Sequence, residues 1–148
     1  MKLSAHFTLD EFTASETAQR RGLDNSLPPE LLMTAQNTAE MMEKIRAVLG
    51  DIPITVTSGY RSPEVNRAIG SSDTSDHIKA TAVDFKCPEF GTPKAIALHL
   101  ANKIDGMGIG QIILEFNAWC HVSTRRPSKE INRVITINQS GTHAGITE

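Results

Sequence analysis

One acidic residue, Asp84, lies inside the short apolar run Ala82-Val83-Asp84-Phe85 and constrains the fold more than any other feature. The alternation around it predicts a buried strand over residues 81–86. A buried carboxylate is costly unless an opposite charge or a metal ion compensates it. The chain must therefore fold so that a compensating partner reaches Asp84.

Two of the five histidines are placed to provide that partner. His77 precedes Asp84 by seven residues, which an extended loop entering the strand can fold into one cluster. His121 belongs to a separate predicted strand, where period two points its side chain away from the face of Cys120. Two histidines and one aspartate form a metal site with an open fourth position, which is typical of catalytic zinc. Spacing alone also fits a solvated loop histidine at 77 and an arginine-paired or strand-edge carboxylate at 84.

The helix signals are regular. Thr8 and Glu11 form a capping box that opens a short helix. Apolar residues at steps of four and three predict a long helix over residues 31–49. A capping hydroxyl followed by proline predicts two further helices, over residues 64–69 and 93–103.

Short β-branched runs predict the remaining strands. Together with the strand around Asp84 they give an α+β fold, a small and mostly antiparallel sheet with flanking helices. We predict one domain over residues 1–137, with a helical part (1–50) and a motif-bearing part (51–137), followed by a loose tail over 138–148. The remaining predicted strands cover residues 53–57, 109–116, 120–124 and 133–137.

Composition excludes several partners. The chain of 148 residues carries 15 basic and 17 acidic side chains, for a formal charge of −2, with no dense basic cluster. We therefore expect no nucleic-acid partner. No run approaches the ~18 apolar residues of a membrane span, and the N-terminus lacks the apolar core of a signal peptide. We expect synthesis in the cytoplasm, no membrane insertion, a monomer, and free core thiols at Cys87 and Cys120.

Three motifs follow one another between residues 53 and 124. They are S-G-Y-R-S at 58–62, S-D-H-I-K-A-T-A-V-D at 75–84 and W-C-H-V-S at 119–123. Their order and joint spacing resemble the zinc D-alanyl-D-alanine carboxypeptidase family, including its phage endolysin members. The resemblance implies the hedgehog/DD-peptidase fold and a zinc ion (Zn2+) held by His77, Asp84 and His121.

The same resemblance assigns roles around the metal. In the family, the arginine of the first motif binds the substrate carboxylate or stabilises the oxyanion, and the serine two residues before the first ligand helps to hold substrate. These residues are Arg61 and Ser75 here; otherwise Arg61 would form a surface ion pair and Ser75 would cap the loop. A guanidinium offers a planar fork for either anion. Tyr60 and Trp119 are candidate substrate contacts, with core packing as their alternative.

Two positions depart from the family pattern. Ala80 replaces a glycine, which would allow close approach or a positive φ. Relatives often place an acid three residues before the last histidine, but that position is Ala118. Phage-type members carry I-L-E-F before the last motif, as in residues 113–116. Glu115 is therefore the candidate general base, which takes a proton from the attacking water and gives it to the leaving amine; otherwise it is an exposed strand-end glutamate.

The resemblance to this family implies a zinc metallopeptidase that hydrolyses peptidoglycan stem peptides. The resemblance implies either a D-Ala-D-Ala carboxypeptidase or an L-alanyl-D-glutamate endopeptidase. A phage or prophage lysin fits best, acting on the cell wall after release or within a phage particle. The alternative is a non-catalytic zinc-binding module that binds the wall or has a structural role in a phage particle.

Overall fold

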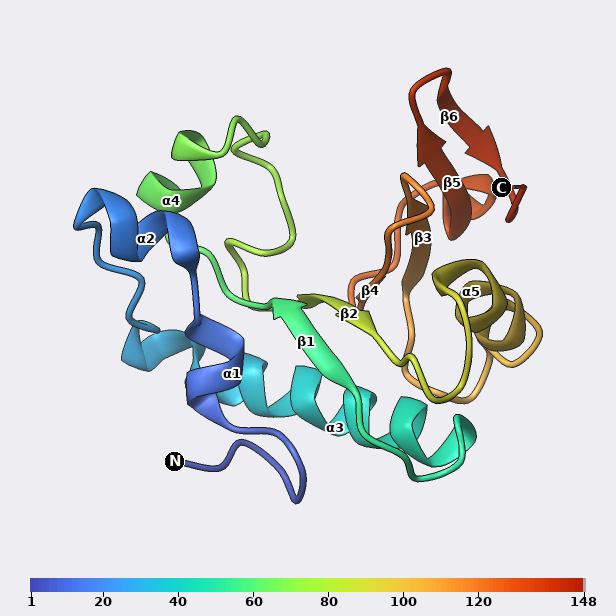
Figure 1. Cartoon of the computed structure of the whole chain (residues 1–148), viewed down its shortest axis with the longest axis horizontal. Helices are drawn as coiled ribbons and strands as arrows, with labels where there is room; N and C mark the ends of the chain where they lie inside the picture. Colours follow the sequence, from blue (N-terminus) through green and yellow to red (C-terminus); the bar gives the residue numbers. More distant parts are fainter. Residues whose placement is uncertain (148) are drawn as a thin grey trace.

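The structure, a computed structural model that describes residues 1–147, has an α+β fold built around a six-stranded sheet (Figure 1). The strand order is β1-β2-β4-β3-β5-β6, and every neighbouring pair is antiparallel except β3 and β5. The predicted fold class is therefore confirmed. The strands are β1 (Thr55–Ser58), β2 (Ala82–Lys86), β3 (Gln111–Glu115), β4 (Trp119–Ser123), β5 (Val134–Asn138) and β6 (Gly141–Ala144).

The helices begin where the capping residues predict. The capping box of Thr8 and Glu11 is formed, and Ser62 and Thr92 each cap a helix whose first residue is proline. None of the described helices combines the length and apolar character needed to cross a bilayer. The helical elements are α1 (Leu9–Thr13), α2 (Glu16–Arg21), α3 (Leu32–Val48), α4 (Pro63–Ala68), α5 (Pro93–Ala101), and the 3-10 turns η1 (Pro29–Leu31) and η2 (Glu130–Asn132).

Alternation along the central strands separates an apolar face from a polar one. The core joins side chains of α3, α5 and the apolar sheet face, and it includes both cysteines as free, buried thiols. On the other face, Asp84 pairs in register with His121, which in turn pairs with Ile113 of β3. In Figure 1, α1, α2 and α4 lie at the β1 end of the sheet, and the β5–β6 hairpin lies at the opposite end. The polar face between them carries the motif residues.

Two elements differ from the sequence prediction. Residues 141–144, assigned above to a loose tail, form β6 and pair with β5. This pairing uses backbone hydrogen bonds, and β6 is largely exposed, so its sequence carries little apolar signal. Helix α2 was not predicted, although Ser15 caps its start and Gly22 ends it in a left-handed conformation. Only six residues long, it is too short to show periodicity.

Thr38 of α3 ties the long helix to the loop that carries His77. The Thr38 side chain is fully buried, and its Oγ1 donates to the carbonyl of Ala80 at 2.7 Å. The backbone N–H of Ala80 donates to the carbonyl of His77 at 3.3 Å. The long helix therefore supports the turn that places the first candidate ligand.

Replacing Thr38 by valine is expected to lower the free energy of unfolding by about 1–3 kcal/mol. Valine keeps the shape of threonine but leaves the buried carbonyl of Ala80 without this donor. Urea denaturation measures the effect, with Thr38→Ser as the matched control because it keeps the hydroxyl. A valine variant as stable as the serine variant would contradict the importance of this hydrogen bond.

Candidate metal centre

Asp84 and His121 meet because they stand opposite each other on neighbouring central strands. In the β2–β4 register the two residues form a direct pair, which brings cross-strand side chains into contact. His121 Nδ1 lies 2.8 Å from Asp84 Oδ1. Each residue is only 7% exposed. His121 is therefore a partner of the kind that the buried carboxylate of Asp84 requires.

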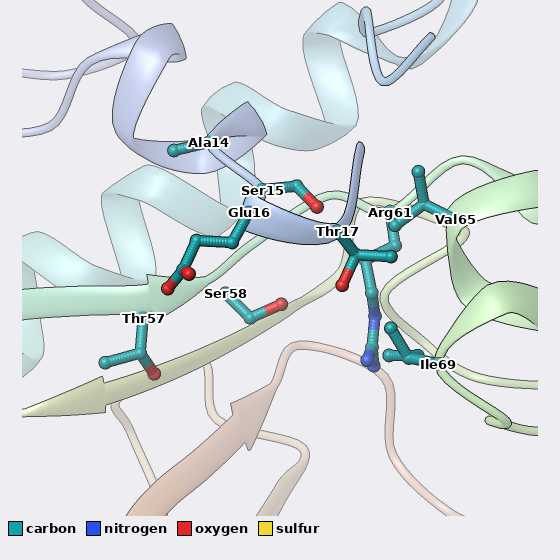
Figure 2. Close-up of a pocket in the computed structure, with 9 residues that line it drawn as sticks. All are labelled: Ala14, Ser15, Glu16, Thr17, Thr57, Ser58, Arg61, Val65 and Ile69. Carbon is teal, nitrogen blue, oxygen red and sulfur yellow. The ribbon is translucent and has the colours of Figure 1, made fainter. Parts of the chain in front are cut away.

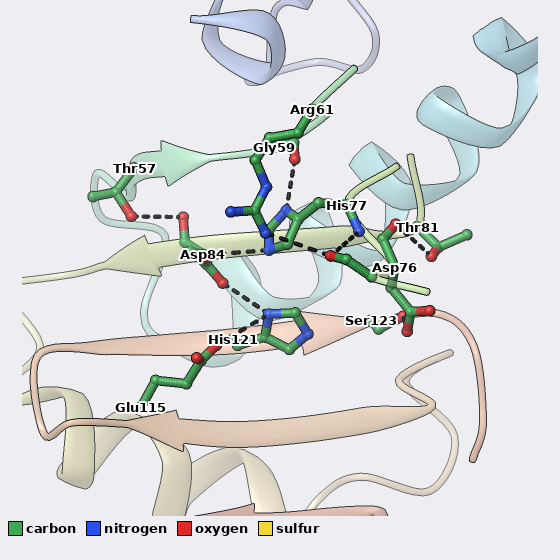
Figure 3. Close-up of polar contacts among 11 residues, drawn as sticks. Thr57, Gly59, Arg61, Asp76, His77, Thr81, Asp84, Glu115, His121 and Ser123 are labelled. Carbon is green, nitrogen blue, oxygen red and sulfur yellow. Dashed lines mark hydrogen bonds and ion pairs between the residues drawn. The ribbon is translucent and has the colours of Figure 1, made fainter. Parts of the chain in front are cut away.

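His77 completes the cluster from the loop between α4 and β2 (Figure 3). Its Nδ1 lies 2.6 Å from the carbonyl oxygen of Gly59. Because a carbonyl only accepts, Nδ1 carries the hydrogen, and the neutral ring keeps its lone pair on Nε2. That Nε2 lies 3.3 Å from Asp84 Oδ2. The backbone of the first motif therefore sets the orientation of the first candidate ligand.

Gly59 performs this role at a position where a larger residue does not fit. A Cβ at residue 59 would lie 2.6 Å from the carbonyl oxygen of Phe12, at the end of α1. The next residue, Tyr60, donates its N–H to the same carbonyl at 2.7 Å. Close packing of α1 against the first motif thus fixes the carbonyl that holds His77.

The three residues fit a divalent metal ion. One ligand atom from each of His77, Asp84 and His121 lies within 4.8 Å of the others. At zinc–ligand distances of about 2.0–2.1 Å, tetrahedral ligands lie on the order of 3.3 Å apart. The ligand nitrogens of His121 and His77 lie 2.8 Å and 3.3 Å from the carboxylate oxygens of Asp84. All three donors are nitrogen or oxygen, and both thiols are in the core, apart from the cluster. The donor set suits zinc with a fourth position open.

The electrostatics of the cluster favour a cation. Burial on its own would raise the pKa of Asp84, but the two histidines hold it well below its usual range. Burial would lower the pKa of His121, yet the hydrogen bond and charge of Asp84 raise it. The buried carboxylate is therefore ionised and attracts positive charge to this point of the sheet.

Glu115 stands beside the cluster at the end of β3. Its Oε1 lies 3.4 Å from His121 Nδ1, and the side chain is 20% exposed. Burial, followed by the charge of Asp84, raises the pKa of Glu115. The indole N–H of Trp119 is close enough to lower that pKa but does not meet hydrogen-bond geometry. The structure thus brings Glu115 to the candidate ligands rather than leaving it at an exposed strand end.

Arg61 lies on the other side of the cluster from Glu115 in Figure 3. Among the described residues, its buried Nε has no hydrogen-bond partner, and its Nη2 reaches Ser75 Oγ only at 3.5 Å. Burial lowers the pKa of Arg61, while Asp84 and Glu115 oppose that shift. Ser75 Oγ also accepts the backbone N–H of His77 at 3.2 Å. A half-buried arginine with unused donors is suited to bind an anion.

A pocket of about 460 Å3 opens over the cluster, and we call it the cleft. Its lining includes the three candidate ligands together with Arg61, Ser75, Glu115, Trp119, Gln111, Ile113 and Arg125. A second pocket of about 340 Å3 lies beyond Arg61, between α2 and α4 (Figure 2). Arg61 lines both pockets, so it lies where the cleft meets the second pocket.

Tyr60 is the predicted site residue that the structure does not bring to the cleft. It is 4% exposed and packs in the apolar core. Asp24 and Glu30 raise its pKa after burial, which places the ring toward the N-terminal segments. Tyr60 lies two residues after β1, and its N–H donates to the carbonyl of Phe12 in α1. The structure therefore places Tyr60 in the core, the alternative that the sequence left open, and not in the lining of the cleft.

The departure at Ala80 leaves the backbone conformation intact. Ala80 adopts a φ of +61°, the left-handed conformation that glycine favours. It is 2% exposed, with its carbonyl held by Thr38. The strain of an alanine in this region is thus tolerated, and the loop still delivers His77 to the cluster.

A second polar group, which the sequence did not predict, lies at the far end of the cleft. Asp76, next to His77, is 6% exposed and accepts hydrogen bonds from Ser123 Oγ at 2.8 Å and Arg125 Nε at 2.6 Å. Period two offered a signal, because Ser123 shares the strand face of His121. No spacing rule pairs Asp76 with Arg125, which lies 49 residues away.

The comparisons with known proteins agree with this geometry. The family model described as Peptidase M15 matches residues 5–123, which is most of the chain and includes all three motifs. A search of curated proteins found no match.

Proposed function

The chain belongs to the peptidase M15 family, the zinc D-Ala-D-Ala carboxypeptidase-like peptidases, and on this premise we propose that it is a zinc-dependent hydrolase of peptidoglycan stem peptides. The observation that carries the proposal is the buried cluster of His77, Asp84 and His121, with Glu115 beside it in the cleft. A lysin of a phage or prophage that reaches the wall after release, or within a particle, is the biological setting we propose.

The residues divide the chemistry among them. His77, Asp84 and His121 would hold the zinc, which when bound supplies Lewis acidity that acidifies water and polarises an amide carbonyl. Glu115 Oε1 accepts a proton from the attacking water while the water oxygen adds to the carbonyl carbon. The same carboxyl gives the proton to the amine nitrogen as the C–N bond breaks.

Arg61 and Ser75 complete the proposed site on the other side of the cluster. The unused donors of the Arg61 guanidinium suit either a substrate carboxylate or the negative charge that develops on the carbonyl oxygen. Ser75 orders the turn through the N–H of His77 and lies at the edge of the guanidinium. Trp119 lines the cleft next to Glu115, where its ring would contact the substrate chain.

Removing the metal tests the proposal. Purified peptidoglycan is incubated with the protein, and new amino and carboxyl ends are identified by mass spectrometry of the released fragments. Treatment with a chelator is expected to stop the release, and zinc is expected to restore it. The fragments also separate a terminal D-alanine cut from a cut between L-alanine and D-glutamate. Peptide release that persists in the chelated protein would contradict the proposal.

The alternative, a zinc-binding module without catalysis, predicts a different result. Such a module would bind zinc and sediment with peptidoglycan, yet release no fragments from walls of either the lysine or the diaminopimelate type. The position of Glu115 beside the ligands favours the enzyme over this module.

A further inference from the structure

A second arginine, Arg125, lies in the cleft without a role in the proposed reaction. Its side chain is 48% exposed, and its Nε donates to Asp76 Oδ1 at 2.6 Å. An arginine has five N–H donors, and Nε provides only one. Among the residues that the structure describes, no hydrogen bond uses the terminal Nη groups of Arg125. Four donors of this cleft-lining arginine therefore remain unused among the described residues.

The backbone of Arg125 is held as firmly as its side chain. Its N–H donates to Ser123 Oγ at 3.1 Å, and Ser123 Oγ donates to Asp76 Oδ2 at 2.8 Å. Gly110 packs so closely against this segment that a Cβ there would lie 2.4 Å from the carbonyl carbon of Arg125. A guanidinium fixed in this way loses little entropy when it binds an anion.

Strand register places Arg125 and Glu115 at opposite ends of the cleft. Glu115 pairs with Trp119 at one end of β4, and Gln111 pairs with Ser123 at the other, with His121 between them. Arg125 lies two residues after Ser123 and four residues after His121. At about 3.4 Å per residue, the four steps from His121 to Arg125 span at most roughly 14 Å of the cleft. An extended peptide bound at the cluster would cover that distance with about two to four residues.

We propose that Arg125 determines specificity by binding a free carboxylate of the substrate, about two to four residues from the bond that is cut. This inference rests on the proposed function, because it concerns the peptide bound at the same cleft. Arg61 lies at the cluster itself, so the two arginines bind different anionic groups. The substrate class is therefore an acidic peptide with a carboxylate distant from the scissile bond.

Binding tests this inference separately from catalysis. Synthetic stem pentapeptides L-Ala-D-γ-Glu-L-Lys-D-Ala-D-Ala are compared in two pairs, and the members of a pair differ only in one carboxyl group, which is free or amidated. In the first pair this is the glutamyl α-carboxyl, which is distant from a D-Ala-D-Ala cut. In the second pair it is the C-terminal carboxyl, which is distant from an L-Ala-D-Glu cut. Affinity is measured by calorimetry on the zinc-loaded Glu115→Gln protein, which is expected to leave the peptides intact. The free carboxylate is expected to bind about 10- to 100-fold more tightly, as for a hydrogen bond to a charged group.

The matched variants are Arg125→Gln and Arg126→Gln in the same background. Arg126 is the adjacent arginine, but its exposed side chain pairs with Glu130 outside the cleft. Arg125→Gln is expected to remove the preference for the free carboxylate while binding the amidated peptide unchanged. Arg126→Gln is expected to keep the preference. If Arg125 had a purely structural role, the Arg125→Gln change would weaken the binding of both peptides equally.

Two results would overturn the inference. One is equal affinity of the Glu115→Gln protein for the two members of each pair, a measurement that does not depend on the folding of any Arg125 variant. The other is an Arg125→Gln protein that keeps the full preference. Absence of hydrolysis by the unaltered enzyme would instead refute the proposed function, and the affinity difference would still decide the role of Arg125.

Discussion

Asp84→Asn is expected to abolish stoichiometric zinc binding and peptidoglycan hydrolysis together. Asparagine keeps the size of the side chain but removes the negative charge that two neutral imidazoles need to match a divalent ion. Loss of a hydrogen-bond partner outside the ligand shell already costs roughly 10- to 100-fold in metal affinity, so loss of a ligand charge should exceed about 100-fold. Zinc titration of the chelated protein, followed by calorimetry, measures the change.

Asp73→Asn is the matched control for that variant. Asp73 is an exposed acid in the loop between α4 and β2. It forms an ion pair with Arg67 of α4 and lies outside the cluster. The same chemical change there should leave zinc affinity and hydrolysis at the level of the unaltered protein. Asp84→Asn protein that still binds one zinc at unchanged affinity would show that Asp84 is not a ligand.

The sequence predicted the Asp84–His121 pair because both residues interrupt apolar strands. A carboxylate in an apolar run requires a partner, and strand alternation puts His121 on the face opposite Cys120. The structure adds the register, which makes them direct cross-strand neighbours. Alternation gives the face of a side chain, while register depends on turns and neighbouring strands and is not readable from either strand alone.

Other parts of the site depend on contacts between distant segments, which no local pattern encodes. Gly59 is required by the approach of Phe12, and its carbonyl orients His77. Tyr60 has the residue type of a substrate contact but turns into the core because α1 holds its N–H. Strand β6 pairs with β5 through backbone hydrogen bonds, so the pattern of its side chains does not predict the strand.

Glu115→Gln is expected to leave zinc binding intact and to lower kcat by about 10²- to 10⁴-fold. Glutamine fills the same space but cannot accept the proton from water. Glu115 Oε1 lies 3.4 Å from His121 Nδ1, near the cluster but supplying none of the three proposed ligands. Elemental analysis and the rate of fragment release, measured on the same preparation, separate the two effects.

Glu89→Gln is the control for the general base. Glu89 is exposed and lies outside the cleft, so its variant should hydrolyse peptidoglycan at the unaltered rate. Full activity in the Glu115→Gln protein would assign the proton transfer to another group. Loss of zinc from that protein would instead indicate that Glu115 takes part in binding the metal.

The most direct test of the account is zinc X-ray absorption spectroscopy, combined with elemental analysis of the purified protein. His77, Asp84 and His121 predict one zinc per chain, with two imidazoles and only nitrogen and oxygen in its first coordination shell. Cys87 and Cys120 are buried in the core and should contribute no sulfur scattering. A protein that takes up no zinc, or a zinc–sulfur distance of about 2.3 Å, would contradict the proposed metal centre.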